Sequence, residues 1–273
     1  MLALAEAPVA LLQRARGIAR VHAVARDGIT EIATLFQEGC AKVRLPHTHD
    51  ASLQAVLMNT AGGLCGGDHI QWQVEAAPQA RVVVTTPACE RGYRSVGGIA
   101  RIENRLTAGE GAVLDWLPQE TILYEGGKLD RRLDVDLAKG ARFTAVEAVL
   151  LGRAAMGETA PGATFTDTWR VRRNGRLIHA EATRLGGTAT ERGGLSLLAG
   201  AAAFATILHI APDAERRLDA VRALLPETAG ASVIGERLVV RAIAASGLAL
   251  RRTIAPIIAV LSGAGALPRL WHL

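Results

Sequence analysis

The sequence predicts a mainly β fold, with stacked sheets or a β-helix-like solenoid as its body and two helical segments near the C-terminus. Three observations support this class. A turn followed by a β-rich run recurs along the chain, two hairpin dipeptides lie between alternating apolar and polar residues, and helical periodicity appears only after residue 211. We expect one domain over 1–273, with a β-rich part at 17–210 and a helix and strand part at 211–273.

Two hairpins are predicted from their turn residues. Residues 17–45 alternate apolar and polar side chains on both sides of Asp27-Gly28, and residues 170–184 do so around Asn174-Gly175. Both dipeptides favour the positive backbone angles of a type I′ turn, which joins antiparallel strands. The chain therefore opens with sheet, and a second hairpin follows its repetitive central part.

The stretch 59–68 (NTAGGLCGGD) is the most distinctive part of the chain, with two Gly-Gly pairs and Asp68 close together. This spacing predicts a tight, shaped loop. The glycines match neither G-x-G-x-x-G nor the P-loop, and 69–77 alternates like a strand instead of beginning a helix. The pattern therefore argues against phosphate binding. We expect the loop to join a strand at 53–58 to the strand at 69–77.

A period appears after this loop. Turn-then-strand starts occur at Ala80, Ala112 and Ala141, about thirty residues apart, and again at Ala163. A β-rich unit of this length can bury its apolar face on its neighbour, as it does in stacked sheets or in a solenoid. The repeat is one of pattern and not of residue identity.

Helical periodicity is confined to the C-terminal part. Asp213 is expected to cap a helix that Pro226 ends, with four apolar residues on one face: Leu218, Val221, Leu224 and Leu225. A strand is expected at 238–243. A second helix is expected at 247–261, where Pro256 should kink it or begin another helix. Its apolar side consists of five residues: Leu250, Ile254, Ile257, Ile258 and Leu261.

Composition argues against several classes of function. The net charge is +5, but the arginines are scattered and only 4 % of the residues are aromatic, so we expect no nucleic-acid partner. Three cysteines at wide spacings indicate neither a disulfide framework nor a structural zinc site. They suit a reducing compartment, and the expected location is the cytoplasm.

Two segments bear on targeting and membranes. Residues 1–17 do not read as a signal peptide, because Glu6 and Pro8 interrupt the apolar stretch and the arginines follow it. The stretch 193–212 carries no formal charge and is about long enough to span a bilayer. Its small and polar residues favour two buried strands joined by a turn. We therefore expect no membrane partner.

The residues taken alone offer little catalytic chemistry. His47 and His49, beside Asp50, form either a solvated turn or part of a metal site that needs further ligands. Cys89 lies in a polar loop at 87–95, but no His is near it in sequence to act as a base. These features favour a binding or assembly protein. The alternative is a β-rich hydrolase or transferase that uses Cys89 and the loop 59–68.

Five motifs follow one another along nearly the whole chain: 59–68 (NTAGGLCGGD), Thr85-Thr86 with 93–95 (YRS), 115–122 (DWLPQETI), 151–158 (LGRAAMGE) and 267–271 (LPRLW). Together they resemble the UreD/UreH family of urease accessory proteins. Two positions depart from that family's pattern. Cys65 stands where Thr or an aliphatic residue is expected, as a soft ligand or a small apolar filler, and Gly92 stands where a β-branched residue is usual.

The resemblance implies a β-rich, solenoid-like body with two helices and a role in urease assembly. Such a protein docks on the urease apoprotein and recruits the helical protein UreF. Through UreF it recruits the GTPase UreG, so that nickel reaches the buried active site. The resemblance implies no catalysis and no permanently bound cofactor, with nickel(II) as transient cargo of an internal channel. The C-terminal helices and the arginine-rich faces are the expected docking surfaces.

A conduit must bind its ion weakly at several places, because entry has to be favourable and exit easy. Carboxylates and carbonyls suit this better than a closed cage of His and Cys, which would trap Ni²⁺. We therefore expect Asp68, Glu120 and Glu158 to face an internal polar passage, with Arg153 paired to one of them.

Overall fold

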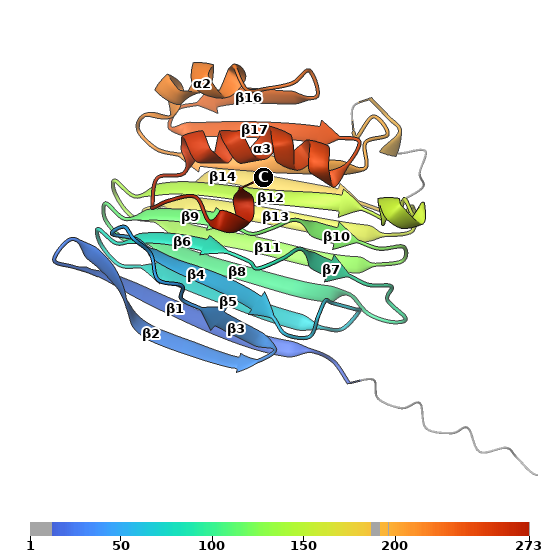
Figure 1. The fold of residues 1–273 in the computed structure, drawn as a ribbon, viewed down its shortest axis with the longest axis horizontal. Coiled ribbons are helices and arrows are strands. Elements are labelled where there is room, and N and C mark those ends of the chain that lie inside the picture. Colours follow the sequence, from blue (N-terminus) through green and yellow to red (C-terminus); the bar gives the residue numbers. More distant parts are fainter. Residues whose placement is uncertain (1–12, 187–191, 196, 273) are drawn as a thin grey trace, which may run out of the picture.

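Two large β-sheets lie face to face in the computed structural model, which describes residues 13–186, 192–195 and 197–272 (Figure 1). The mainly β class predicted from the sequence is confirmed, and the stacked arrangement is solenoid-like. Most of the N-terminal segment that argued against a signal peptide, residues 1–12, lies outside the described part.

The first sheet has seven strands. In spatial order they are β14 (Arg176–Leu185), β13 (Thr164–Arg173), β11 (Lys128–Leu137), β8 (Ala100–Ala108), β5 (His69–Ala76), β1 (Arg16–Arg26) and β2 (Ile29–Gly39). The five central strands run parallel to one another. One antiparallel strand closes each edge, β14 beside β13 and β2 beside β1.

The second sheet has ten strands, eight of them in one path. These are β16 (Ala229–Ile234), β17 (Arg237–Ala244), β15 (Ala203–Ile210), β12 (Arg142–Leu151), β9 (Val113–Leu117), β6 (Arg81–Thr85), β4 (Leu53–Asn59) and β3 (Ala41–Arg44). Two short strands lie off this path, where β10 (Thr121–Leu123) pairs with both β12 and β7 (Glu90–Gly92). The strands β4, β6, β9 and β12 are parallel.

The chain crosses between the two sheets at almost every strand of its central part, from β4 to β13. The predicted starts at Ala80, Ala112 and Ala141 precede β6, β9 and β12, which are neighbours in the second sheet. Their first core residues are in register, Val82 with Leu114 and Leu114 with Phe143. The start at Ala163 follows the previous one after fewer residues, because it precedes a strand of the first sheet. This strand, β13, comes directly after β12 of the second sheet.

Both predicted hairpins are confirmed. Asp27 and Gly28 join β1 to β2, and Asn174 and Gly175 join β13 to β14. The non-glycine residue of each turn has a φ of 49°, in the left-handed region that Asp and Asn tolerate better than most residues.

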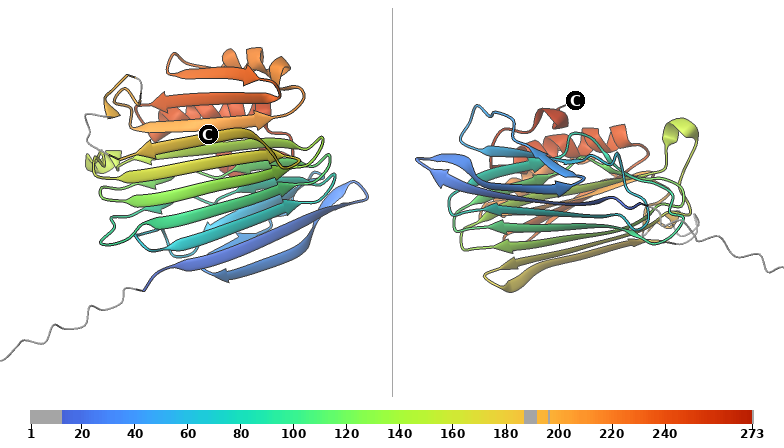
Figure 2. Two further views of the ribbon diagram at one scale, coloured as in Figure 1. Left: turned by 180° about the vertical axis from the view of Figure 1, so that it is seen from behind. Right: turned by 90° about the horizontal axis from the view of Figure 1, so that it is seen from below.

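The main core lies between the sheets, and a second core lies under two helices on the outer face of the second sheet. Figure 2 shows these helices on one side of the two layers. Helix α3 (Gly247–Leu261) begins and ends where the sequence predicted, and its five apolar residues are buried. Pro256 lies within this single helix and begins no second one.

Three details of the prediction are wrong. Helix α2 (Ala214–Arg222) ends before Leu224, which is exposed. Asp213 makes no side-chain cap, because its carboxylate binds Arg142 and Arg217 instead. The stretch 193–212 contains one strand in its described part, β15, and residues 197–200 form turns in which Ala199 and Gly200 have positive φ. The described helices include none long and apolar enough to cross a membrane.

We expect Leu250→Ala to lower the free energy of unfolding by about 2–5 kcal/mol. The side chain of Leu250, on α3, is fully buried in the second core, and its removal leaves a cavity. Urea denaturation followed by circular dichroism measures the change. Leu248→Ala is the matched control, since Leu248 lies on the same helix but is 56 % exposed. Equal losses for the two variants would contradict the packing described for α3.

Candidate functional site

Parallel strands in both layers bring loops from distant parts of the chain to one end of the stack. Strands β4, β6, β9 and β12 finish there, and β5, β8, β11 and β13 begin there. We call this the site end, and it lies to the right in Figure 1, near β7 and β10. It comprises the loops 60–68, 86–99, 118–127 and 152–163. The three acids expected to line the passage, Asp68, Glu120 and Glu158, lie in these loops.

Asp68 holds the glycine-rich loop in shape. Its side chain is buried, and its two carboxylate oxygens accept hydrogen bonds from the backbone N–H groups of Ala15 and Cys65, both at 2.8 Å. Gly63 has a φ of 144°, and a Cβ there would lie 2.3 Å from the ring of Tyr93. The loop therefore joins β4 to β5 as predicted, and glycine is needed where the Tyr93 ring approaches the backbone.

Cys65 is a partly buried neutral thiol within this loop. Arg14 donates a hydrogen bond to its sulfur at 3.3 Å. Burial, followed by the nearby Asp68 carboxylate, raises the pKa of the thiol. A thiol that resists deprotonation is a poor soft ligand, which fits the role of a small filler.

Glu120 connects the site end to the C-terminal helix. It is buried between β9 and β10, and Arg251 of α3 donates to both carboxylate oxygens at 2.9 and 2.8 Å. Burial pushes its pKa upward, but the hydrogen bonds from Arg251 outweigh this and hold the pKa below the usual value. The Arg251 guanidinium also lies 5.0 Å from the ring of Trp271, so one arginine fixes the loop, α3 and the C-terminal segment together.

Glu158 pairs with Arg153 near the surface of the site end. The Arg153 guanidinium also lies over the ring of Tyr124, 4.7 Å from its centre. The second carboxylate oxygen of Glu158 accepts a hydrogen bond from the backbone N–H of Glu125 at 3.0 Å. The hydrogen bonds from Arg153 hold the pKa of Glu158 below its usual value.

The two loops required by the hydrolase alternative do meet. Cys89 and parts of the loop 59–68 line a cavity of about 190 Å³. Burial, together with the neighbouring Glu120 carboxylate, raises the pKa of Cys89 to about 11, and its thiol donates to Glu120 at 3.4 Å. A thiol with this pKa is protonated at neutral pH. The geometry therefore argues against Cys89 as a nucleophile.

His47 and His49 lie edge to face, with ring centres 5.8 Å apart. They border the cavity of about 590 Å³ between the loop 46–54 and the C-terminal segment 266–270. No group of three or more His, Cys, Asp or Glu residues positioned to hold a metal occurs in the described part of the chain. Among the described residues, the two histidines therefore have no third ligand of these types around which a closed metal site could form.

Sequence reasoning missed a buried charge cluster between the sheets. Arg131 on β11 contacts Asp167 on β13 at 2.8 Å and Glu147 on β12 at 2.5 Å. Trp116 donates to Glu147 at 2.9 Å, and Trp169 donates to Asp167 at 3.0 Å. All three charged side chains are at most 8 % exposed. The available signal was an arginine at an inward position of an alternating strand.

A second buried acid, Glu181 on β14, bridges the two sheets. Its carboxylate accepts from Arg241 at 2.6 Å and from Thr206 at 3.1 Å, and both of these partners belong to the second sheet. His179 lies 3.6 Å away. Burial raises the pKa of Glu181, but the neighbouring His179 and then the hydrogen bond from Arg241 outweigh it and leave the pKa below its usual value.

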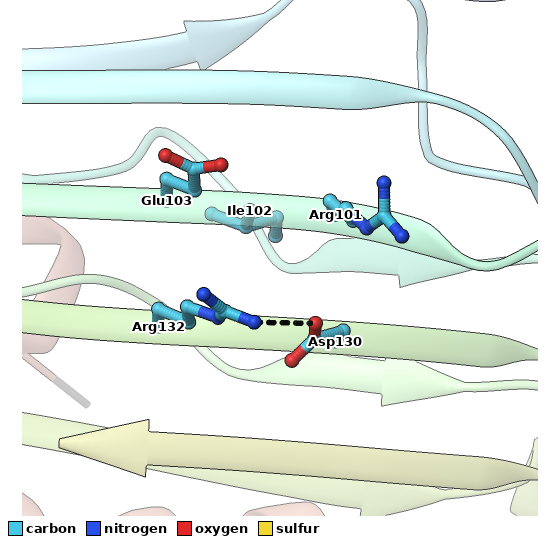
Figure 3. Close-up of a pocket in the computed structure, with 5 residues that line it drawn as sticks. All are labelled: Arg101, Ile102, Glu103, Asp130 and Arg132. Carbon is cyan, nitrogen blue, oxygen red and sulfur yellow. Dashed lines mark ion pairs between the residues drawn. The ribbon is translucent and has the colours of Figure 1, made fainter.

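The outer face of the first sheet is charged, and several of its charges form ion pairs. Figure 3 shows a shallow cavity of about 200 Å³, where Arg132 faces Asp130 at 3.7 Å. Glu103, on the neighbouring strand, contacts Arg105 at 2.8 Å and His69 at 3.1 Å. These charges pair along and across the strands, and Arg101 is the one charged residue of the cavity's lining without an ion pair to another described residue.

We expect the free energy of unfolding to fall as the pH rises from about 4.5 to about 7, through Glu147. Burial, opposed by Arg131 and reinforced by Asp167, raises the pKa of Glu147 from 4.5 to about 7. The folded chain therefore holds this proton more tightly than the unfolded chain, and the advantage is lost as the pH passes the folded value.

Urea denaturation across this pH range measures the effect in wild type and in Glu147→Gln. The variant should lack this component, which is on the order of 1.4 kcal/mol for each pKa unit. Glu110→Gln, at an exposed loop acid, is the control that should keep it. Parallel pH profiles for Glu147→Gln and wild type would contradict the raised pKa.

Comparison with known proteins assigns the family. A family profile described as "UreD urease accessory protein" matches residues 15–272. A protein of Chelativorans sp. (strain BNC1) named "Urease accessory protein UreD" is 58 % identical over 270 residues, which cover 98 % of each chain. A protein of Rhizobium etli with the same name is 51 % identical, covering 96 % of each chain.

A further relative, "Urease accessory protein UreD 1" of Brucella melitensis biotype 1, is 46 % identical and covers 95 % of each chain. The names describe an accessory role, and the family is not one of catalytic enzymes. The match spans the five motifs as well as the sheets and helices that carry them. The chain therefore belongs to the UreD family of urease accessory proteins.

Proposed function

We propose that this protein acts in the maturation of urease. It docks on the urease apoprotein and, together with UreF and the GTPase UreG, enables nickel to enter the active site. The observation that carries the proposal is the family match over nearly the whole chain, with relatives at 46–58 % identity that bear the name of a urease accessory protein. The expected place of action is the cytoplasm, and the three free cysteines suit a reducing compartment.

The polar residues of the site end favour a scaffold over an enzyme. Asp68 is bonded to backbone N–H groups, Glu120 to Arg251, and Glu158 to Arg153. Cys89 is held as a protonated thiol beside Glu120. Side chains committed to internal partners define a shape, whereas a nucleophilic thiol must lose its proton near neutral pH.

Nickel(II) is proposed as transient cargo and not as a resident cofactor. Carboxylates bind a divalent ion more weakly than a set of thiolate and imidazole ligands, which suits passage through several sites. Asp68, Glu120 and Glu158 remain the predicted acids of this route at the site end. The structure adds Glu147 and Glu181 as buried carboxylates farther inside the stack, which an internal route between the sheets would meet.

Co-expression tests the function. Urease apoprotein produced with UreF and UreG should acquire nickel and activity when this chain is present and should stay largely nickel-free when it is absent. Nickel per urease active site, measured on the purified enzyme by mass spectrometry, is the readout. Full nickel content without this chain would overturn the proposed function.

Substitutions of Glu158, which pairs with Arg153, distinguish a role in nickel binding from a purely structural role. We expect Glu158→Gln to slow nickel incorporation by about 10-fold, because the carboxylate that would bind the ion is lost, a change equivalent to about 1.4 kcal/mol. Glu158→Asp keeps a carboxylate at this position, so it should leave incorporation closer to that of wild type.

The same assay tests the alternative function. Cys89→Ala should also leave nickel incorporation unchanged, since burial and the neighbouring Glu120 carboxylate keep the thiol protonated. If Cys89→Ala abolished urease activation while complex formation persisted, the hydrolase or transferase alternative would gain support. If Glu158→Gln and Glu158→Asp had equal effects, Glu158 would be a structural residue only.

A further inference from the structure

An aromatic and basic surface lies at the site end, and two of its arginines take no part in the ion pairs described above. It consists of Arg91, Tyr93, Arg94, Tyr124 and Arg153, and we call it the tyrosine surface. The chain has only two tyrosines, and both are here. Tyrosine and arginine are the residue types that dominate the binding energy of protein interfaces, which makes their coincidence here informative.

The aromatic rings are fixed in place before any partner arrives. Tyr93 and Tyr124 pack edge to face with ring centres 5.2 Å apart, and Arg153 covers Tyr124 from above. The backbone N–H of Tyr93 donates to Leu64 at 2.7 Å, and that of Tyr124 donates to Gly92 at 2.9 Å. Loops held in this way lose little conformational freedom on binding, so their contacts contribute more fully to affinity.

The surface carries unpaired positive charge. Glu158 neutralises Arg153, but none of the ion pairs between described residues involves Arg91 or Arg94, and both arginines are exposed. The side chain of Arg94 packs on Gly126, where a Cβ would lie 3.2 Å from it. Two exposed cations beside two phenol rings favour a partner that presents carboxylates, because the charges then complement each other across the contact.

Exposed apolar side chains flank these cations. Val96 is 79 % exposed, Ile99 is 48 % exposed, and Met156, on the short helical turn η1 (Ala154–Met156), is 72 % exposed. All three lie in the same loops as the tyrosines and Arg153. Apolar groups around basic and aromatic anchors match a protein surface better than a small anion, which would contact only the cations.

We propose that the tyrosine surface is where the urease apoprotein docks, through a segment that carries carboxylates beside apolar side chains. This inference rests on the proposed function and adds the location of the contact. The apoprotein is the chosen occupant because Asp68, Glu120 and Glu158 all lie in loops of this end, so cargo that passes these acids leaves where its recipient must be held.

Binding of purified urease apoprotein to the full chain, measured by biolayer interferometry, tests the proposal. Replacing both free cations, Arg91→Glu with Arg94→Glu, should raise the Kd by at least about 10-fold and weaken the dependence of binding on salt. Tyr93→Ala should also raise the Kd by about 10-fold, through loss of an aromatic anchor.

A matched control carries the same change of charge at the opposite end of the stack. Arg26→Glu with Arg176→Glu alters two exposed arginines beside the hairpin turns, and it should leave the Kd within about twofold of wild type. Circular dichroism and the Tm of each variant establish that it is folded. The arginine variants are fully informative even if Tyr93→Ala is destabilised, since Arg91 and Arg94 are exposed.

Each outcome has a distinct meaning. Loss of binding in the Arg91 and Arg94 variant but not in the control supports the tyrosine surface. Wild-type affinity in that variant, or an equal loss in the control, overturns the proposed surface and leaves the proposed function intact. Failure of the wild-type chain to bind the apoprotein overturns both, and the co-expression assay then shows whether the protein acts on urease without docking.

Discussion

One constraint shapes the whole molecule: the chain must cross between two sheets whose central strands are parallel. A parallel strand cannot be reached by a tight turn, so each unit runs along one sheet and returns along the other. Crossings of the same kind then gather at one end. Backbone hydrogen bonds join them, as between Leu64 and Arg91 or between Tyr124 and Gly92. Loops far apart in the chain thereby form one continuous surface.

The same stacking requires polar groups between the layers to find partners across them. Arg131 of the first sheet meets Glu147 of the second, and Glu181 of the first meets Arg241 of the second. Asp115 accepts from the backbone N–H groups that follow α3, at 3.0 and 2.8 Å, and so anchors the C-terminal segment. These contacts fix the position of one sheet relative to the other. Apolar packing alone would fix it less well, because the hydrophobic effect is not directional.

The predicted acids show which contacts a sequence motif can reveal and which it cannot. The motif around Glu158 also contained its partner Arg153, only five residues away. The partner of Glu120 is Arg251, which lies 131 residues further along the chain, and no local pattern connects the two. Glu147 and Glu181 could not be identified from the sequence, because each lies in a β-strand without any local motif. Only its position on the inward face of the sheet distinguishes it.

The sequence by itself determined the features that depend on neighbouring residues: both hairpins, helix α3, the glycine-rich loop, the period of the stack and the family. Turn chemistry and periodicity act over a few residues, so they can be read directly. Only the tertiary structure decided which carboxylate meets which arginine, that Asp213 binds side chains instead of capping α2, and that Tyr93 and Tyr124 share one surface. Those contacts depend on the register between strands and sheets, which residues far apart in the chain fix together.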